Sequence, residues 1–151
     1  TLDALEPYRL SGPEQNPEAL SYLKYNGKKR IDIELEVYIQ PEGKKPTMIT
    51  HSNYKNMYWN MSQQLAHHTI NGCNIKGGDM MASGTISGPT SDSFGSMLEL
   101  SWAGSKKIDL DDGSERKFIL DGDTVIMKGW CDNNTIRIGF GEVKNKVLPT
   151  G

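Results

Sequence analysis

The chain has 151 residues, about one domain's worth, and 17 Lys and Arg against 19 Asp and Glu give it a formal net charge of −2 at pH 7. This near-neutral balance argues against nucleic-acid binding, which usually needs a basic patch, and the 36% hydrophobic content excludes a disordered chain. No apolar run reaches the roughly 18 residues that span a bilayer, and the first residues lack the basic start of a secretory signal. We therefore expect a soluble cytoplasmic protein without a membrane or nucleic-acid partner.

Glycine and proline predict the general character of the chain. Its 16 glycines exceed the average frequency of about 7% and indicate a β-rich, turn-rich domain. Pro7, Pro13 and Pro17 lie close together near the start. Because prolines remove amide donors and break helices and sheets, we expect residues 1–30 to form an extended proline-rich arm that is ordered only along another surface.

The clearest strand is expected over residues 31–39, where aliphatic side chains alternate with polar ones. Residues 52–67 predict the main helix, because apolar residues recur there at helical spacing and Ser52 or Asn53 can cap its start. Gly72 lies past the expected helix end, where a left-handed residue would terminate it.

Further strands are expected between turn signals such as Asp112-Gly113 and Asp121-Gly122. They cover residues 47–50, 80–86, 97–102, 117–120, 124–130 and 135–140. Short strands separated by such turns are typical of a sandwich, barrel or roll.

Thr85 is the first candidate site residue. It lies between Gly84 and Gly88, and glycines let the backbone approach a ligand closely while a threonine hydroxyl can bind a carboxylate or carbonyl oxygen. The alternative interpretation is an ordinary β-turn at the end of a strand.

Glu99 is the second candidate. On a strand over 97–102 it would share a face with Met97 and Ser101, with Leu98, Leu100 and Trp102 on the opposite face. A half-buried carboxylate needs a partner and often orients a catalytic histidine. The alternative is a solvated acid on a strand.

The remaining reactive side chains form no recognisable site. His67 and His68 are adjacent, so on a helix they would point about 100° apart and could not both face one metal ion. Cys73 and Cys131 have no evident base partner. The residues alone therefore predict a β-rich domain with two candidate site residues and no complete catalytic set.

Three segments carry a resemblance to a known family: residues 58–74 (YWNMSQQLAHHTINGCN), 82–89 (ASGTISGP) and 94–102 (FGSMLELSW). They closely resemble the eukaryotic fumarylacetoacetase family, and the similarity extends over essentially all 151 residues. The resemblance implies a mostly β fold with one main helix (α+β), a mixed β-roll or sandwich like the C-terminal domain of that family. Residues 1–151 would be a single partial domain, the last part of the catalytic domain.

The family resemblance also implies functional roles. Thr85 matches the family's substrate-binding threonine, and Glu99 matches the glutamate that pairs with the catalytic histidine. The family's metal-binding acids, its histidine and its active-site lysine precede the region matched here, so we expect Ca²⁺ or Mg²⁺ to be held by an N-terminal remainder and the chain alone to be inactive.

The implied activity is hydrolysis of 4-fumarylacetoacetate to fumarate and acetoacetate in tyrosine and phenylalanine catabolism, by an enzyme that forms a homodimer. One alternative is a related acylpyruvate-type hydrolase, although Ile86-Ser87 after the threonine favours the first activity. The other alternative is a non-catalytic β-sandwich binding module.

Overall fold

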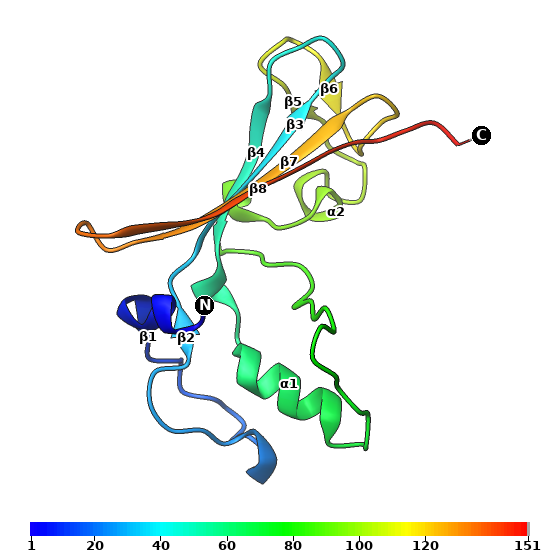
Figure 1. Cartoon of the computed structure of the whole chain (residues 1–151). Helices are drawn as coiled ribbons and strands as arrows, with labels where there is room; N and C mark the ends of the chain where they lie inside the picture. Colours follow the sequence, from blue (N-terminus) through cyan, green and yellow to red (C-terminus); the bar gives the residue numbers. More distant parts are fainter. Residues whose placement is uncertain (151) are drawn as a thin grey trace.

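A four-stranded antiparallel sheet lies at the centre of the structure, a computed structural model that describes residues 1–150 (Figure 1). The strand order is β4-β3-β7-β8, so β3 and β7 are adjacent although they are far apart in the sequence. The four strands are β3 (Glu34–Gln40), β4 (Thr47–Asn53), β7 (Thr124–Asp132) and β8 (Arg137–Lys146). The β7–β8 hairpin projects beyond the other two strands (Figure 1).

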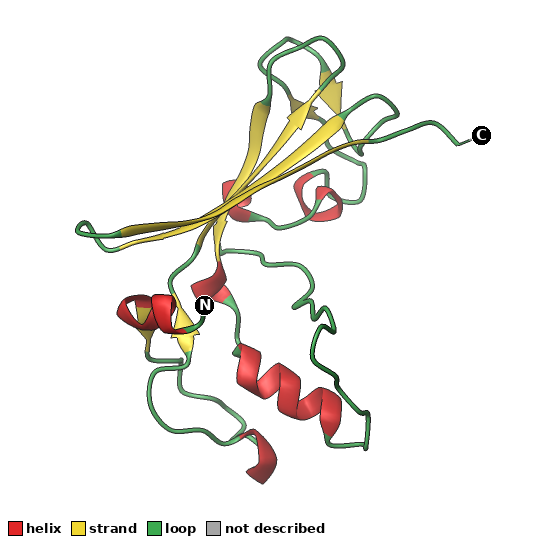
Figure 2. Cartoon of the chain, in the orientation of Figure 1, coloured by secondary structure: helices red, strands yellow, loops and turns green. Residues whose placement is uncertain are grey.

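Smaller elements lie at the two ends of this sheet, and Figure 2 shows how little of the chain is helical. Two-stranded pairs are formed by β1 (Arg9–Leu10) with β2 (Arg30–Ile31) and by β5 (Ile108–Asp109) with β6 (Glu115–Arg116). The helices are α1 (Met61–Thr69) and α2 (Met97–Leu100), with 3-10 turns η1 (Asp3–Tyr8), η2 (Ser21–Leu23), η3 (Tyr54–Asn56) and η4 (Ser91–Ser93). The predicted mostly β, α+β fold class is confirmed.

The strand predicted over residues 31–39 is divided in two. Ile31 belongs to β2, and β3 begins only at Glu34, because the amide of Asp32 donates a hydrogen bond to the carbonyl of Tyr8 rather than to the main sheet. The alternation is confirmed only in part: Ile31, Ile33 and Ile39 are buried, whereas Leu35 and Val37 are half-buried like the polar residues between them.

The main helix starts later than predicted. Ser52 and Asn53 belong to β4, and the Asn53 side chain caps the 3-10 turn η3 by accepting from the amide of Lys55. The helix cap is Asn60, whose side chain accepts from the amide of Gln63 while Gln63 accepts in return from the Asn60 amide. The prediction of Ser52 or Asn53 as helix cap is therefore wrong, because pairing of β4 with β3 extends to position 53.

Three predicted strands are absent from the described residues. Residues 80–86 and 117–120 form irregular segments, and residues 97–100 form the short helix α2. The strands predicted over 124–130 and 135–140 are confirmed as β7 and β8, although β8 begins at Arg137 and continues to Lys146.

The largest buried cluster lies where the N-terminal segment meets the sheet. Leu5 and Tyr8 of η1 pack there with Ile31, Tyr54 and Cys131. Residues 1–30 thus contain two 3-10 turns and β1, and they contribute side chains to the core. The described part of the chain contains no helix with the length and apolarity needed to cross a membrane.

Candidate functional site

Glu99 lies on α2, and two serine hydroxyls hold its carboxylate. Ser87 Oγ donates to the carboxylate at 2.7 Å from Oε2 and 2.9 Å from Oε1, and Ser96 Oγ donates to Oε2 at 3.0 Å. The Glu99 side chain is partly buried. The prediction that Glu99 lies on a strand is wrong, because residues 97–100 are helical, and Leu98 and Trp102, expected on the opposite face, are each 59% exposed.

The local sequence explains why this segment is helical. Ser96 is the N-cap of α2, and its hydroxyl accepts from the amide of Glu99 at 3.2 Å while donating to the Glu99 carboxylate. A serine cap followed three residues later by glutamate is a helix-start pattern, and the carboxylate lies in the first turn where amides are free. Short-range capping therefore determines the conformation of residues 97–100.

Gly95 joins the two candidate segments. Its amide donates to Ser87 Oγ at 3.1 Å, and a Cβ at position 95 would lie 2.6 Å from the carbonyl oxygen of Ile86 and 2.8 Å from Cγ2 of Thr85. Only a residue without a Cβ permits this approach. The structure therefore brings the Thr85 segment and the Glu99 segment together at Gly95.

Thr85 and Glu99 differ in the hydrogen bonds that their side chains form. Thr85 is exposed, and its hydroxyl forms no hydrogen bond with any residue in the range 1–150. The Glu99 carboxylate is held by hydroxyls, and the hydrogen bond from Ser87 is the main reason why the pKa of Glu99 lies below its usual value, with smaller contributions from Ser96 and Gly95. Glu99 is thus an ionised acceptor at neutral pH, and the Thr85 hydroxyl, on the segment that meets Gly95, has no protein partner within residues 1–150.

A carboxylate of this kind can accept the N–H of an imidazole and stabilise the protonated ring. The histidines within residues 1–150 have other partners: His51 contacts Glu34 at 2.8 Å, and His67 contacts the Tyr22 hydroxyl at 2.9 Å. His68 lies 3.4 Å from the Cys73 sulfur. The buried Cys131 thiol has a pKa raised by burial, which makes it a poor nucleophile.

The described residues also do not fit a metal ion. No group of three or more His, Cys, Asp or Glu side chains within residues 1–150 is arranged to hold one. Two acids from the Asp-rich turns have other roles: Asp112 accepts from Ser114, and Asp123 accepts from Arg116. No chemical step can therefore be assigned to a metal bound by these residues alone.

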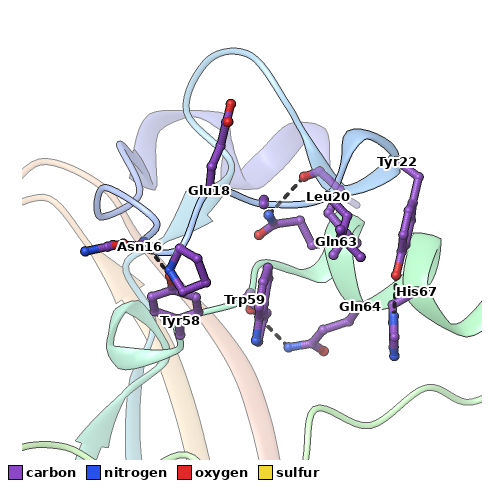
Figure 3. Close-up of a pocket in the computed structure, with 12 residues that line it drawn as sticks. Asn16, Glu18, Leu20, Tyr22, Tyr58, Trp59, Gln63, Gln64 and His67 are labelled. Carbon is purple, nitrogen blue, oxygen red and sulfur yellow. Dashed lines mark hydrogen bonds between the residues drawn. The ribbon is translucent and has the colours of Figure 1, made fainter.

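A cavity lies between the N-terminal segment and α1, and sequence reasoning did not predict it. This cavity has a volume of about 560 Å³ and is lined largely by apolar groups, including Tyr22, Tyr58 and Trp59 (Figure 3). Its polar groups bond one another: the Tyr22 hydroxyl contacts His67, and the Asn16 amide donates to the Tyr58 hydroxyl. The adjacent aromatic residues at 58 and 59 were the one signal in the sequence that could have predicted this cavity. Because the polar groups of the cavity are hydrogen-bonded to one another, Thr85 and Glu99 are the better candidates for chemistry.

Comparison with known proteins finds similarity over nearly the whole chain. The sequence pattern of a family described as "Fumarylacetoacetate (FAA) hydrolase C-terminal" matches residues 10–148. A fumarylacetoacetase from Dictyostelium discoideum is 51% identical over 152 residues, covering 99% of this chain and 36% of that protein. The Homo sapiens fumarylacetoacetase is 52% identical over 149 residues, with 98% and 36% covered. The chain thus spans about a third of the length of the curated relatives it matches.

Proposed function

The chain belongs to the fumarylacetoacetate hydrolase family, and on this premise we propose that it is the C-terminal part of a fumarylacetoacetase. The reaction would be addition of water across a carbon–carbon bond of 4-fumarylacetoacetate. The hydroxyl goes to the fumaroyl carbonyl carbon, the bond to the acetoacetate carbon breaks, and that carbon takes up the proton. The observation that carries the proposal is the Glu99 carboxylate, held by two serine hydroxyls, on a segment that meets the Thr85 segment at Gly95.

Glu99 would act on a histidine supplied by the preceding part of the enzyme. Such a histidine takes a proton from water as general base, and the carboxylate fixes its tautomer and stabilises the imidazolium. Thr85 would donate its hydroxyl to an oxygen of the substrate and hold it for attack by water. Both roles need an ionised carboxylate and an unoccupied hydroxyl, and the site provides them.

The remaining components lie outside this chain in our proposal. The relatives are nearly three times as long as the matched region, which supports an N-terminal remainder that contributes the histidine and the ligands for Ca²⁺ or Mg²⁺. By the same family resemblance we propose a homodimeric, cytoplasmic enzyme of tyrosine and phenylalanine catabolism. An acylpyruvate-type hydrolase is the second candidate activity, because such a site would also accept a shorter diketone.

The test uses the full-length enzyme, meaning the longer polypeptide that we propose contains this chain. An equivalent form carries this chain in place of the matched C-terminal part of the Dictyostelium fumarylacetoacetase. Loss of the diketone ultraviolet absorbance is followed with fumarylacetoacetate and with an acylpyruvate. We expect faster turnover of fumarylacetoacetate and strong loss of activity in Glu99→Gln. Preference for the acylpyruvate would support the second activity, and no turnover of either compound would favour a binding module.

A further inference from the structure

Ser87 makes the shortest contact to the Glu99 carboxylate, yet the roles described so far involve only Thr85 and Glu99. Ser87 Oγ lies 2.7 Å from Oε2 and 2.9 Å from Oε1, so its single hydroxyl proton is shared between the two oxygens. Ser87 follows Thr85 by two residues and belongs to the same segment, which meets Gly95. It therefore contacts the reactive carboxylate from the substrate-binding segment.

The orientation of the Ser87 hydroxyl is itself fixed. Ser87 Oγ accepts the amide proton of Gly95 at 3.1 Å, which occupies one lone pair and directs the hydroxyl proton away from that amide. Gly95 reaches this position only because it has no Cβ to collide with Ile86. The donor that holds Glu99 is thus anchored to the backbone rather than free to rotate.

The two carboxylate oxygens are not equally occupied. Of the side-chain hydroxyls, both Ser87 and Ser96 donate to Oε2, whereas Ser87 alone donates to Oε1. Each carboxylate oxygen has two lone pairs, so Oε1 has more acceptor capacity left. None of the charged side chains within residues 1–150 forms an ion pair with Glu99, and its direct partners are hydroxyl and amide groups.

We propose that Ser87 is a positioning residue for Glu99, which turns the carboxylate so that Oε1 receives the N–H of the catalytic histidine. This proposal rests on the proposed function. Without the Ser87 hydroxyl, Ser96 would be the one side-chain hydroxyl left on the carboxylate, at Oε2, and Oε1 would lose its hydroxyl partner. Ser96 also caps α2, so a substitution of Ser96 would disturb the helix as well as the carboxylate. A substitution of Ser87 changes the orientation of the carboxylate and leaves the helix cap in place.

The first test is steady-state kinetics of Ser87→Ala in the full-length enzyme. A hydrogen bond to a charged group is typically strong enough that its loss should lower kcat about tenfold or more, with KM changed less than about twofold. Ser87→Thr retains a hydroxyl and should recover part of kcat. The matched control is Ser105→Ala, whose exposed hydroxyl donates only to the carbonyl of Trp102 and whose loss should leave kcat unchanged.

A double-mutant cycle shows whether Ser87 acts through Glu99. If it does, Ser87→Ala should have little further effect on kcat in the Glu99→Gln background, because the carboxylate that it orients is already gone. Losses of kcat that multiply in the double variant would overturn the proposal. A lower melting temperature with unchanged kcat per folded enzyme would overturn it as well, since that result indicates a structural serine.

Titration of the Glu99 carboxyl carbon by NMR gives a readout that does not need turnover. The signal is assigned by its disappearance in Glu99→Gln, and Ser87→Ala should raise the pKa of Glu99 because it removes the main group that lowers it. An unchanged titration overturns the role of Ser87. A wild-type enzyme that shows the expected titration but no hydrolysis would instead overturn the proposed function, and with it the histidine partner assigned to Oε1.

Discussion

Gly95 and Ile86 are so close that a Cβ on residue 95 would lie 2.6 Å from the carbonyl oxygen of Ile86, a distance that real Cβ contacts do not show. The atoms that such a Cβ would meet belong to the backbone of Ile86, which cannot move aside as the end of a long side chain can. This approach and the hydrogen bonds of Ser87 hold together the segment with Thr85 and the segment with Glu99. Small additions at such a position should therefore have large effects on the site.

Gly95→Ala should lower kcat/KM of the full-length enzyme more than about tenfold. The added methyl group pushes residues 85–87 away and breaks the contact of Ser87 with Glu99, and overpacking of this kind typically costs about 1–3 kcal/mol. Steady-state kinetics and a thermal melt measure both effects. Gly77→Ala is the matched control, because a Cβ there meets no atom within 4 Å. Equal activity of the two variants would contradict the importance of this approach.

Glu99→Gln should lower kcat about 100-fold or more and leave KM nearly unchanged. The amide can still accept from Ser87 and Ser96, so the fold is retained, but it lacks the charge that stabilises an imidazolium. Kinetics over a pH range measures the loss of the charge, and a thermal melt of the same variant shows whether the fold is retained. Near-normal kcat would show that Glu99 serves only the structure of α2.

Thr85→Val should weaken substrate binding without changing stability. Valine has almost the same shape as threonine, and the Thr85 hydroxyl has no protein partner within residues 1–150 that would be left unsatisfied. Loss of one hydrogen bond to a charged substrate group predicts about a tenfold fall in kcat/KM. The measurement is kcat/KM together with the melting temperature. A large fall in melting temperature would instead indicate a structural hydroxyl.

The buried pair of Arg116 and Asp123 predicts the response of stability to acid. The guanidinium donates twice to the Asp123 carboxylate, at 2.8 Å each, and this holds the pKa of Asp123 below its usual range. A lowered carboxyl pKa means that the pair stabilises the protein above the ordinary aspartate value and loses this effect as pH falls through the lower folded value. Stability of the full-length enzyme should therefore decrease below about pH 4.

Asp123→Ala should cost about 3–5 kcal/mol of stability at neutral pH, because it leaves the largely buried Arg116 charge without its carboxylate partner. It should also flatten the loss of stability below about pH 4. Denaturant unfolding at several pH values measures both. Glu115→Gln removes the partner of Lys107 in an exposed pair and should change stability little. A similar cost for the two variants would contradict the role given to burial.

Sequence patterns predicted this structure unevenly, and the helices show why. Asn53 and Asn60 are both good helix caps, and only the pairing of β4 with β3 places Asn53 in the sheet. Periodicity could not reveal that competition, because it depends on a partner strand. The four residues 97–100 alternate like a strand, yet the Ser96 cap makes them helical. By contrast β7 has flanking turns and strong β-formers, so local signals were sufficient.

The candidate site was predicted by residue but not by geometry. Glycine spacing makes Thr85 a candidate, a half-buried carboxylate on an expected strand makes Glu99 one, and the family resemblance favours both. Ser87 was not identified, because its importance depends on the return of the chain at Gly95, eight residues later. Contacts made by an irregular segment have no periodic signal in the sequence. The roles of Thr85 and Glu99 remain predictions for the kinetic experiments above.

The outer strand β8 pairs with β7 on one edge only, and most of its ten residues are exposed, including Phe140 and Val143. Its second edge offers unpaired backbone donors and acceptors to any strand that reaches it. In a preparation of residues 1–151 alone, this edge should make the particle size depend on protein concentration. Light scattering over a dilution series would show it. A designed strand that pairs with this edge of β8 would block self-association and keep the isolated chain monomeric.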